Sequence, residues 1–439
     1  MKKLSLLLLP ALMLAVFDGQ SYDLNNWRCA FTNYGTWGYI SSRAGGFWHD
    51  TAYIYGAGIW VGRMNGNDTL VTIGYNPNSG RSEMFPTLTR DWRQGSGDPR
   101  DRIYKYPGDW PAPPDRFPMA PAVPRSDIEA WACCCDSAPA QHQTPGRPIG
   151  FDLYLTVFAF ADSRYSDFFF LRYELVNSSG ATMSSVCVGQ AIDADVGNAA
   201  DDMTGFIRDR LFQVGGDTIR VRNTGYCYST DNVPSGAVAV MLLEAPAGLG
   251  LTAFKVFTLQ DADPITDFEQ YLALSGHNWS PPYEYDPYDS LDAAPADKRY
   301  LLATGPFDLE PDSLVTFVYA VIGTPFAPND TSELAQRCQW AREAWDRVLS
   351  VSELRSRQFD RRLFVGPNPC CPAMPLQVRA RPGERLAVRV YNAAGTLVTE
   401  LAGNGSVTWS GLGSPQGVYV VRIEAGRQAQ THKILYLND

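Results

Sequence analysis

The side chains best suited to chemistry lie in an acidic run at residues 193–202. This run follows an apolar segment that predicts a strand, and it contains a Gly197-Asn198 pair typical of a turn. Its candidate ligands are Asp193, Asp195, Asp201 and Asp202. Carboxylates two residues apart beside a turn can converge on a hard cation such as Ca²⁺. The spacing is not that of an EF-hand, because Asn198 replaces the invariant glycine and no glutamate closes the loop. We expect either a structural calcium site or a plain solvated acidic loop.

Signals for covalent catalysis are weak. The chain contains neither a G-x-S-x-G elbow nor an H-E-x-x-H helix, and no glycine-rich phosphate loop precedes a helix. Of the four histidines, only His49, beside Asp50, has a suggestive setting, and a lone histidine near aromatic residues usually has a packed or surface role. The triplet at 133–135 is the densest group among nine cysteines, but adjacent cysteines lack the spacers that zinc sites use. We predict no catalytic residues, and we expect the triplet in a surface loop with one or two disulfides.

Tryptophans gather in the first quarter of the chain. They are Trp27, Trp37, Trp48, Trp60, Trp92 and Trp110. Exposed tryptophan rings stack on sugars, whereas buried ones fill the core of a large sandwich. The two interpretations correspond to two function classes: a carbohydrate-binding or glycan-degrading protein, and a protein without such a surface.

Composition places the chain among folded globular proteins. Its 439 residues are 45% hydrophobic and 19% charged, enough for two or three domains with a large core. The 22 tyrosines, 38 glycines and 31 prolines favour strands and turns over helices. The net charge is −10, although residues 362–439 carry eight basic and four acidic side chains. An acidic body repels phosphates, which argues against a nucleic-acid partner.

The N-terminus has the plan of a secretory signal peptide. Met1-Lys2-Lys3 precedes an apolar run to Phe17, which is too short to span a bilayer. We assign residues 1–21 to this signal, with cleavage near Gly19 or Ser21. No later stretch has membrane-spanning length, so we expect no transmembrane segment after signal removal and a location outside the cytoplasm.

Alternating apolar patterns predict an all-β body at residues 22–350. Strand candidates lie at 53–62, 69–73, 151–160, 169–175, 186–192, 237–243, 251–259 and 315–322. A large antiparallel β-sandwich accommodates them. Residues 93–150 lose this pattern, so we expect an irregular excursion there, either functional or a lineage-specific insertion. Residues 331–350 predict one peripheral helix, and the charged 351–362 segment predicts a linker.

Residues 363–439 predict a small separate sandwich. The Pro367-Asn368-Pro369 opening leads to strand-turn-strand at 390–398, then Trp409, then Gly417-Val418-Tyr419. This order resembles the type A-like C-terminal sorting domain of cargo of the bacterial type IX secretion system. It is also similar to immunoglobulin-like domains such as that of the flagellar hook-capping protein. Cys370-Cys371 departs from the family, in which an aromatic residue is common at this place.

The resemblance implies where the protein is delivered. In this family the tail docks on outer-membrane secretion machinery, is typically removed, and leaves the cargo released or anchored at the cell surface. The body, through Gly58-Ile59-Trp60-Val61-Gly62 and Thr304-Gly305-Pro306-Phe307, is similar to uncharacterised large exported β-proteins. We therefore expect a non-enzymatic exported protein. The alternative is a secreted protein that binds or degrades carbohydrate, with surface polysaccharide as its partner.

Overall fold

The computed structural model describes most of the chain. The described residues are 17–92, 98–143, 146–231, 236–258, 263–292, 294–327, 330–346, 364–366, 370–372, 375–379, 385–393, 395–425 and 428–437. They divide into two compact units, one ending at Asp346 and one beginning at Phe364. Residues 1–16 of the predicted signal peptide and the predicted linker at 351–362 lie outside these ranges. The first strand begins at Gly19, so the last three residues assigned to the signal belong to a paired strand.

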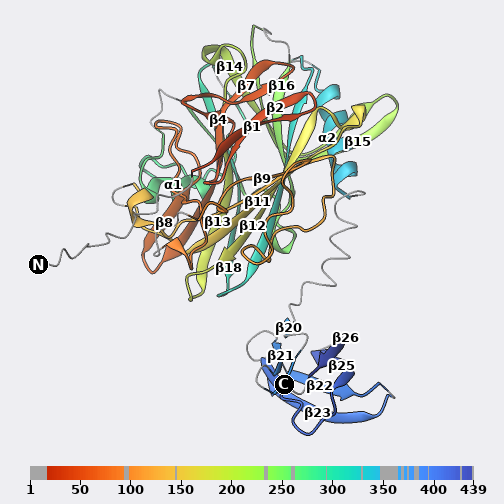
Figure 1. The fold of residues 1–439 in the computed structure, drawn as a ribbon. Helices are drawn as coiled ribbons and strands as arrows, with labels where there is room; N and C mark the ends of the chain where they lie inside the picture. The colour runs from red at the N-terminus through yellow and green to blue at the C-terminus, as the bar shows by residue number, and fades with distance from the viewer. Residues whose placement is uncertain are drawn as a thin grey trace, which may run out of the picture. The chain divides into compact units, whose positions relative to one another are not determined.

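The body contains two large antiparallel sheets, as the sequence predicts (Figure 1). In spatial order the first runs β1 (Gly19–Leu24), β2 (Trp27–Thr32), β3 (Thr36–Trp37), β7 (Thr51–Asn65), β13 (Met183–Ala194), β18 (Lys298–Leu309) and β17 (Ala253–Thr258). Two further strands join it: β6 (Gly46–Trp48) pairs with β2 and β7, and β8 (Asp68–Ile73) pairs with β7. A small separate hairpin pairs β4 (Tyr39–Ile40) with β5 (Arg43–Ala44).

The second sheet packs on the first. Its order is β14 (Asp202–Val214), β15 (Asp217–Ser229), β16 (Ala237–Glu244), β19 (Leu314–Thr324), β12 (Phe168–Asn177), β11 (Phe151–Ala159), β10 (Ile128–Cys135) and β9 (Tyr104–Tyr106). Side chains from the facing strands interleave in one hydrophobic core, for example Val188 and Leu302 with Leu153 and Phe169. The all-β sandwich prediction is confirmed.

The segment at 93–150 is more regular than the sequence predicts. It contains β9 and β10, and β10 is buried on both faces. Cys134 lies in the core between the sheets, whereas Trp131 and Cys133 lie in a second cluster with Phe117 on the outer face. Apolar residues on both faces remove the alternation that marks a half-buried strand, which explains the error.

Two α-helices occur in the described residues, one on each side of the body in Figure 1. The predicted helix is α2 (Ser332–Ala344), which contacts β15 and β19 of the second sheet. The second helix, α1 (Asp267–Leu274), was not predicted; it contacts β7 and β8 of the first sheet. A capping box marks its start, with Thr266 and Glu269 each bonding the other's backbone, and T-x-x-E was its sequence signal. No described helix has the length and apolar character that crossing a membrane requires.

The C-terminal unit is a small sandwich with its own core. One sheet orders β20 (Phe364–Gly366), β21 (Leu376–Arg379) and β24 (Ser406–Trp409), and the other orders β23 (Leu397–Asn404), β22 (Arg385–Tyr391), β25 (Gly417–Ala425) and β26 (Gln428–Tyr436). The predicted strand-turn-strand is the β22–β23 hairpin, whose turn contains Gly395 at φ 79°. This left-handed backbone conformation favours glycine.

The contact of α1 with the first sheet yields a stability prediction. Leu274 is 0% exposed, and a Cβ built on Gly62 or Gly189 would lie 2.9 Å from one of its methyl groups. We expect Leu274→Ala to lower the free energy of unfolding of the body by about 2–5 kcal/mol, because it leaves a cavity. Phe268→Ala in the same helix removes a side chain that is 47% exposed and should cost less than about 1 kcal/mol. Urea unfolding monitored by tryptophan fluorescence measures both, and equal losses would contradict this role of Leu274.

Candidate metal centre

The centre of the candidate site is Asp193 on β13. Its cross-strand neighbours are Gly56 on β7 and Arg299 on β18. Glycine is required at 56 because a Cβ there would lie 2.3 Å from the ring of Tyr75. With that space open, the Tyr75 hydroxyl donates a 2.8 Å hydrogen bond to Oδ2 of Asp193. The carboxylate is therefore buried and held in place, with only 3% of the residue exposed.

Arg299 is the cation nearest this carboxylate. Its Nε lies 3.2 Å from Oδ1 of Asp193, its Nη1 lies 3.7 Å from Oδ2 of Asp263, and its Nη2 lies 3.8 Å from Oδ1 of Asp297. One guanidinium thus faces three carboxylates and cannot neutralise all of them.

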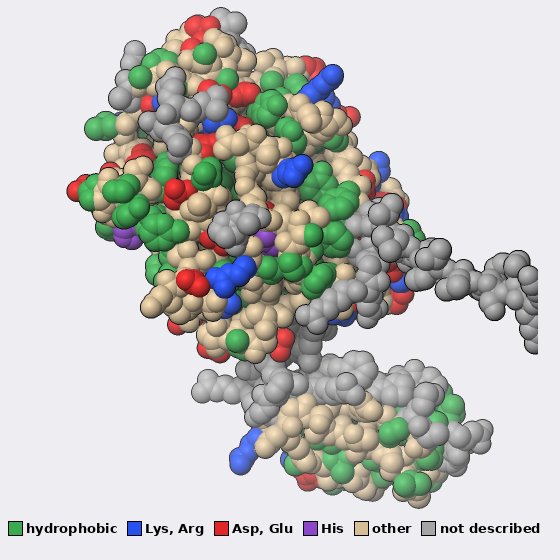
Figure 2. Space-filling view, turned by 90° about the vertical axis from the view of Figure 1, so that its left-hand side faces the viewer, with side chains coloured by type: hydrophobic (Ala, Val, Ile, Leu, Met, Phe, Trp, Pro, Cys, Tyr) green, Lys and Arg blue, Asp and Glu red, His purple; other side chains and the backbone are tan. Residues whose placement is uncertain are grey.

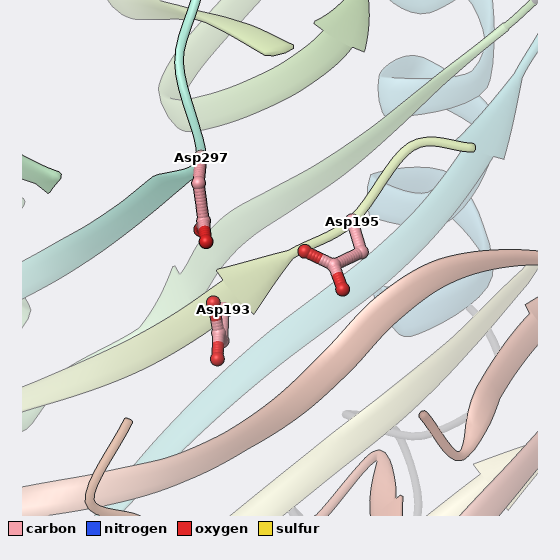
Figure 3. A group of neighbouring side chains, drawn as sticks. All are labelled: Asp193, Asp195 and Asp297. Atoms are coloured by element: carbon pink, nitrogen blue, oxygen red, sulfur yellow. The ribbon is translucent and has the colours of Figure 1, made fainter. Parts of the chain in front are cut away.

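Three carboxylates converge at one end of the first sheet. β13 ends and β18 begins at the same end of the sheet, because the two strands are antiparallel neighbours. Asp195 lies just past the end of β13, and its backbone N–H donates to the carbonyl of Tyr53. Asp297 lies just before β18. One oxygen each from Asp193, Asp195 and Asp297 lie within 4.8 Å of one another, and Figure 3 shows the three side chains turned toward a common space.

Asp202 lies beside this group. It begins β14 with 0% of its surface exposed, and its Oδ2 accepts the N–H of Val196 at 3.2 Å. Its backbone carbonyl accepts the N–H of Ala296 at 3.1 Å, so it joins the segments that carry Asp195 and Asp297. Oδ1 of Asp202 has no hydrogen-bond partner among the described residues.

The structure revises the set of ligands predicted from sequence. It brings Asp193 and Asp195 together, as the two-residue spacing suggested, and places Asp202 near Asp195 but outside the converging group. Asp201 ends a short 3₁₀ turn after Asn198 and is not one of the three converging carboxylates. Asp297 was missed, because nothing local in the sequence links it to residue 193; only the pairing of β13 with β18 does.

Burial raises the pKa values of the carboxyl groups in this cluster. Desolvation raises the pKa of Asp193 to about 7. The positive charge of Arg299 lowers this pKa in part, and the negative charge of Asp195 raises it further. Desolvation and the charge of Asp297 raise the pKa of Asp195 to about 6. Desolvation is also the main cause that raises the pKa of Asp202 to about 9. Neighbouring acids contribute to each shift, so the folded body disfavours ionisation of this cluster.

The donor set determines what chemistry is open to the cluster. All its groups are hard carboxylate oxygens, which suit Ca²⁺ or Mg²⁺ rather than zinc or copper. A role as paired acid and base on a polymer is a poor fit, because Asp193 is buried beneath Tyr75 and paired with Arg299.

The other predicted sites have structural roles. Nε2 of His49 lies 3.7 Å from Oδ1 of Asp167, and its side chain is 58% exposed. The cysteine triplet lies inside the buried strand β10, so the expected disulfide-bearing surface loop is wrong; all nine cysteines are free thiols. Among the first-quarter tryptophans, four are at most 5% exposed: Trp27, Trp37, Trp48 and Trp60. Trp92 and Trp110 are half-buried.

Comparisons with known proteins do not identify the chain. No family model matches it, and no curated protein matches it. Among solved structures, a polysaccharide lyase is 8% identical with a TM-score of 0.26, covering 87% of this chain and 39% of the lyase. The BSP domain of a biofilm associated protein is 9% identical with a TM-score of 0.16, covering 97% of this chain and 82% of that domain. At these TM-scores neither neighbour carries an argument about this protein.

The raised pKa values predict the pH dependence of stability. Well below pH 3.8, the ordinary pKa, the carboxyls are protonated in both the folded and the unfolded chain. Between the ordinary value of 3.8 and about 9, the unfolded chain releases these protons first, so rising pH favours unfolding. In buffer free of divalent cations we expect the melting temperature of the body to fall from about pH 5 to about pH 8.

Asp202→Asn should reduce this slope, because it removes the group with the highest pKa among the three. Asp217→Asn, at an exposed position at the start of β15, is the matched control and should keep the slope. Thermal unfolding followed by near-UV circular dichroism measures all three proteins. Identical slopes in Asp202→Asn and the wild type would contradict the assignment.

Proposed function

We propose that this chain is an exported bacterial protein of the cell surface or exterior. In this proposal residues 363–439 are a sorting module that docks on type IX secretion machinery. The body acts outside the cell as a non-enzymatic binding or structural domain. The observation that carries the proposal is the separate C-terminal sandwich, which has its own hydrophobic core and strand edges.

Two residues that carry the resemblance, Trp409 and Tyr419, also build that core, whereas Pro367-Asn368-Pro369 lies outside the described residues. The rings of Trp409 and Tyr419 lie 5.1 Å apart, and both contact the ring of Tyr436. Gly411, at φ 67°, allows close approach, since a Cβ there would lie 2.1 Å from the ring of Tyr436. A module whose core is complete in itself can fold and dock as a unit, which is what an export handle requires.

The module also presents apolar side chains to solvent. Val418 on β25 and Leu435 on β26 are cross-strand partners, 36% and 41% exposed. On the edge strand β23, Leu397 and Val398 are 48% and 40% exposed. Exposed apolar side chains on neighbouring strands are typical of a docking surface.

The carbohydrate alternative has less support. It needs exposed tryptophan rings, and four of the six first-quarter tryptophans are core residues. Figure 2 shows one face of the body, on which hydrophobic side chains form separate groups among acidic and basic ones. A polysaccharide array probed with the full chain tests this alternative, and saturable binding to one glycan would favour it.

Export of the chain tests the sorting proposal. In a bacterium with type IX secretion, we expect the full chain to reach the cell exterior and a chain ending at residue 362 to stay in the periplasm. Val418→Ser/Leu435→Ser should reduce export while the module stays folded, because it changes exposed side chains only. Leu412→Ser, at a position 76% exposed outside the strands, is the control within the same module. Immunoblots of cell fractions report the outcome, and surface delivery of the truncated chain would overturn the proposal.

A further inference from the structure

The acidic cluster lies where the chain passes from one sheet of the sandwich to the other. β13, which ends at Ala194, belongs to the first sheet, and β14, which begins at Asp202, belongs to the second. Residues 195–201 make the crossing. Asp297 approaches the same point from the segment before β18. A ligand bound there would contact both strands that flank the crossing and the start of a third.

The charges at this point do not balance. Five carboxylates lie in this region, and the one guanidinium among them contacts three. The acids are Asp193, Asp195, Asp202, Asp263 and Asp297, and the base is Arg299. The neighbouring Lys298 does not relieve the excess, because its Nζ is paired with Asp292 at 2.7 Å. When ionised, the cluster has an excess of negative charge that burial makes costly.

Unpartnered oxygens provide a second, independent observation. Oδ1 of Asp202 is fully buried and accepts no hydrogen bond from any described residue, although Oδ2 of the same carboxylate is bonded. Oδ1 of Asp297 is likewise buried and accepts no hydrogen bond within the described ranges, since Nη2 of Arg299 lies 3.8 Å from it, beyond hydrogen-bond distance. Asp202 is close enough to Asp195 and Asp297 for both charges to act on it. Buried polar atoms are normally satisfied, so oxygens left open beside converging carboxylates point to a missing positive partner.

We propose that Asp195, Asp202 and Asp297, together with Asp193, bind one divalent cation, and that this cation is Ca²⁺. The cation fastens the crossing segment at residues 195–201 to both sheets. Oxygen-only ligands, several of them carboxylates on separate chain segments, fit the flexible coordination of Ca²⁺ better than the strict octahedron of Mg²⁺. The calcium proposal does not depend on the export proposal, so either one can be wrong while the other holds.

Calorimetry on the full chain tests binding directly. After dialysis against a chelator, titration with CaCl₂ should show one saturable site per chain, and the melting temperature of the body should rise. The same titration with MgCl₂ should give weaker binding. Absence of binding heat and of any melting shift at millimolar Ca²⁺ would overturn the proposal, and would mean that protons alone neutralise the cluster.

Paired variants distinguish ligands from structural residues. Asp195→Asn/Asp297→Asn should abolish calcium binding and its stabilising effect, yet melt at or above the wild-type temperature in chelator, because it removes repulsion between acids. Asp217→Asn should bind calcium as the wild type does. Calcium binding at wild-type stoichiometry in the double variant would refute the assignment.

Hydrogen exchange locates the effect without any variant. Calcium should slow amide exchange in residues 195–204 and at the start of β18 by at least tenfold, and should leave the C-terminal module unchanged. Protection confined to any other part of the body would place the ion elsewhere and overturn the proposal.

Discussion

The packing of two broad antiparallel sheets against each other is the constraint on which the body depends. Each sheet is also covered on part of its outer face, the first by α1 and the second by α2 and by the Phe117–Trp131 cluster. Strands such as β10 and β11 are therefore buried on both sides. Polar groups therefore lie mostly at strand ends and at crossings between the sheets. There the backbone changes direction, and charged side chains contact one another or solvent.

The acidic cluster follows from that arrangement. Asp193 belongs to a central strand, so its carboxylate is covered on the outer face by Tyr75 and neutralised only in part by Arg299. Charge buried in this way must be protonated or paired with a cation, because water cannot solvate it. The same crossing links the two sheets, so the ionisation state of a few carboxylates and the rigidity of that end of the sandwich are coupled.

The C-terminal module obeys a different constraint. It is small, and its core combines buried aliphatic side chains with the three packed rings of Trp409, Tyr419 and Tyr436. Glycines at its turns permit left-handed backbone and close ring packing. Exposed apolar side chains on its strands, such as Val418 and Leu435, form the surface on which the proposed docking would take place.

Local pattern was enough to predict the strand-rich sandwich, the α2 helix, the separate tail and the pairing of Asp193 with Asp195, because alternation, capping and turn residues act over a few positions. The T-x-x-E capping box of α1 is a local signal of the same kind, present in the sequence at residues 266–269. Three features were decided by tertiary structure alone: the placement of Asp297 beside residue 193, the burial of four tryptophans, and the strand character of the cysteine triplet. Each depends on which distant strands pair and which outer faces of the sheets are covered. The residues adjacent in sequence carry no signal for those long-range contacts.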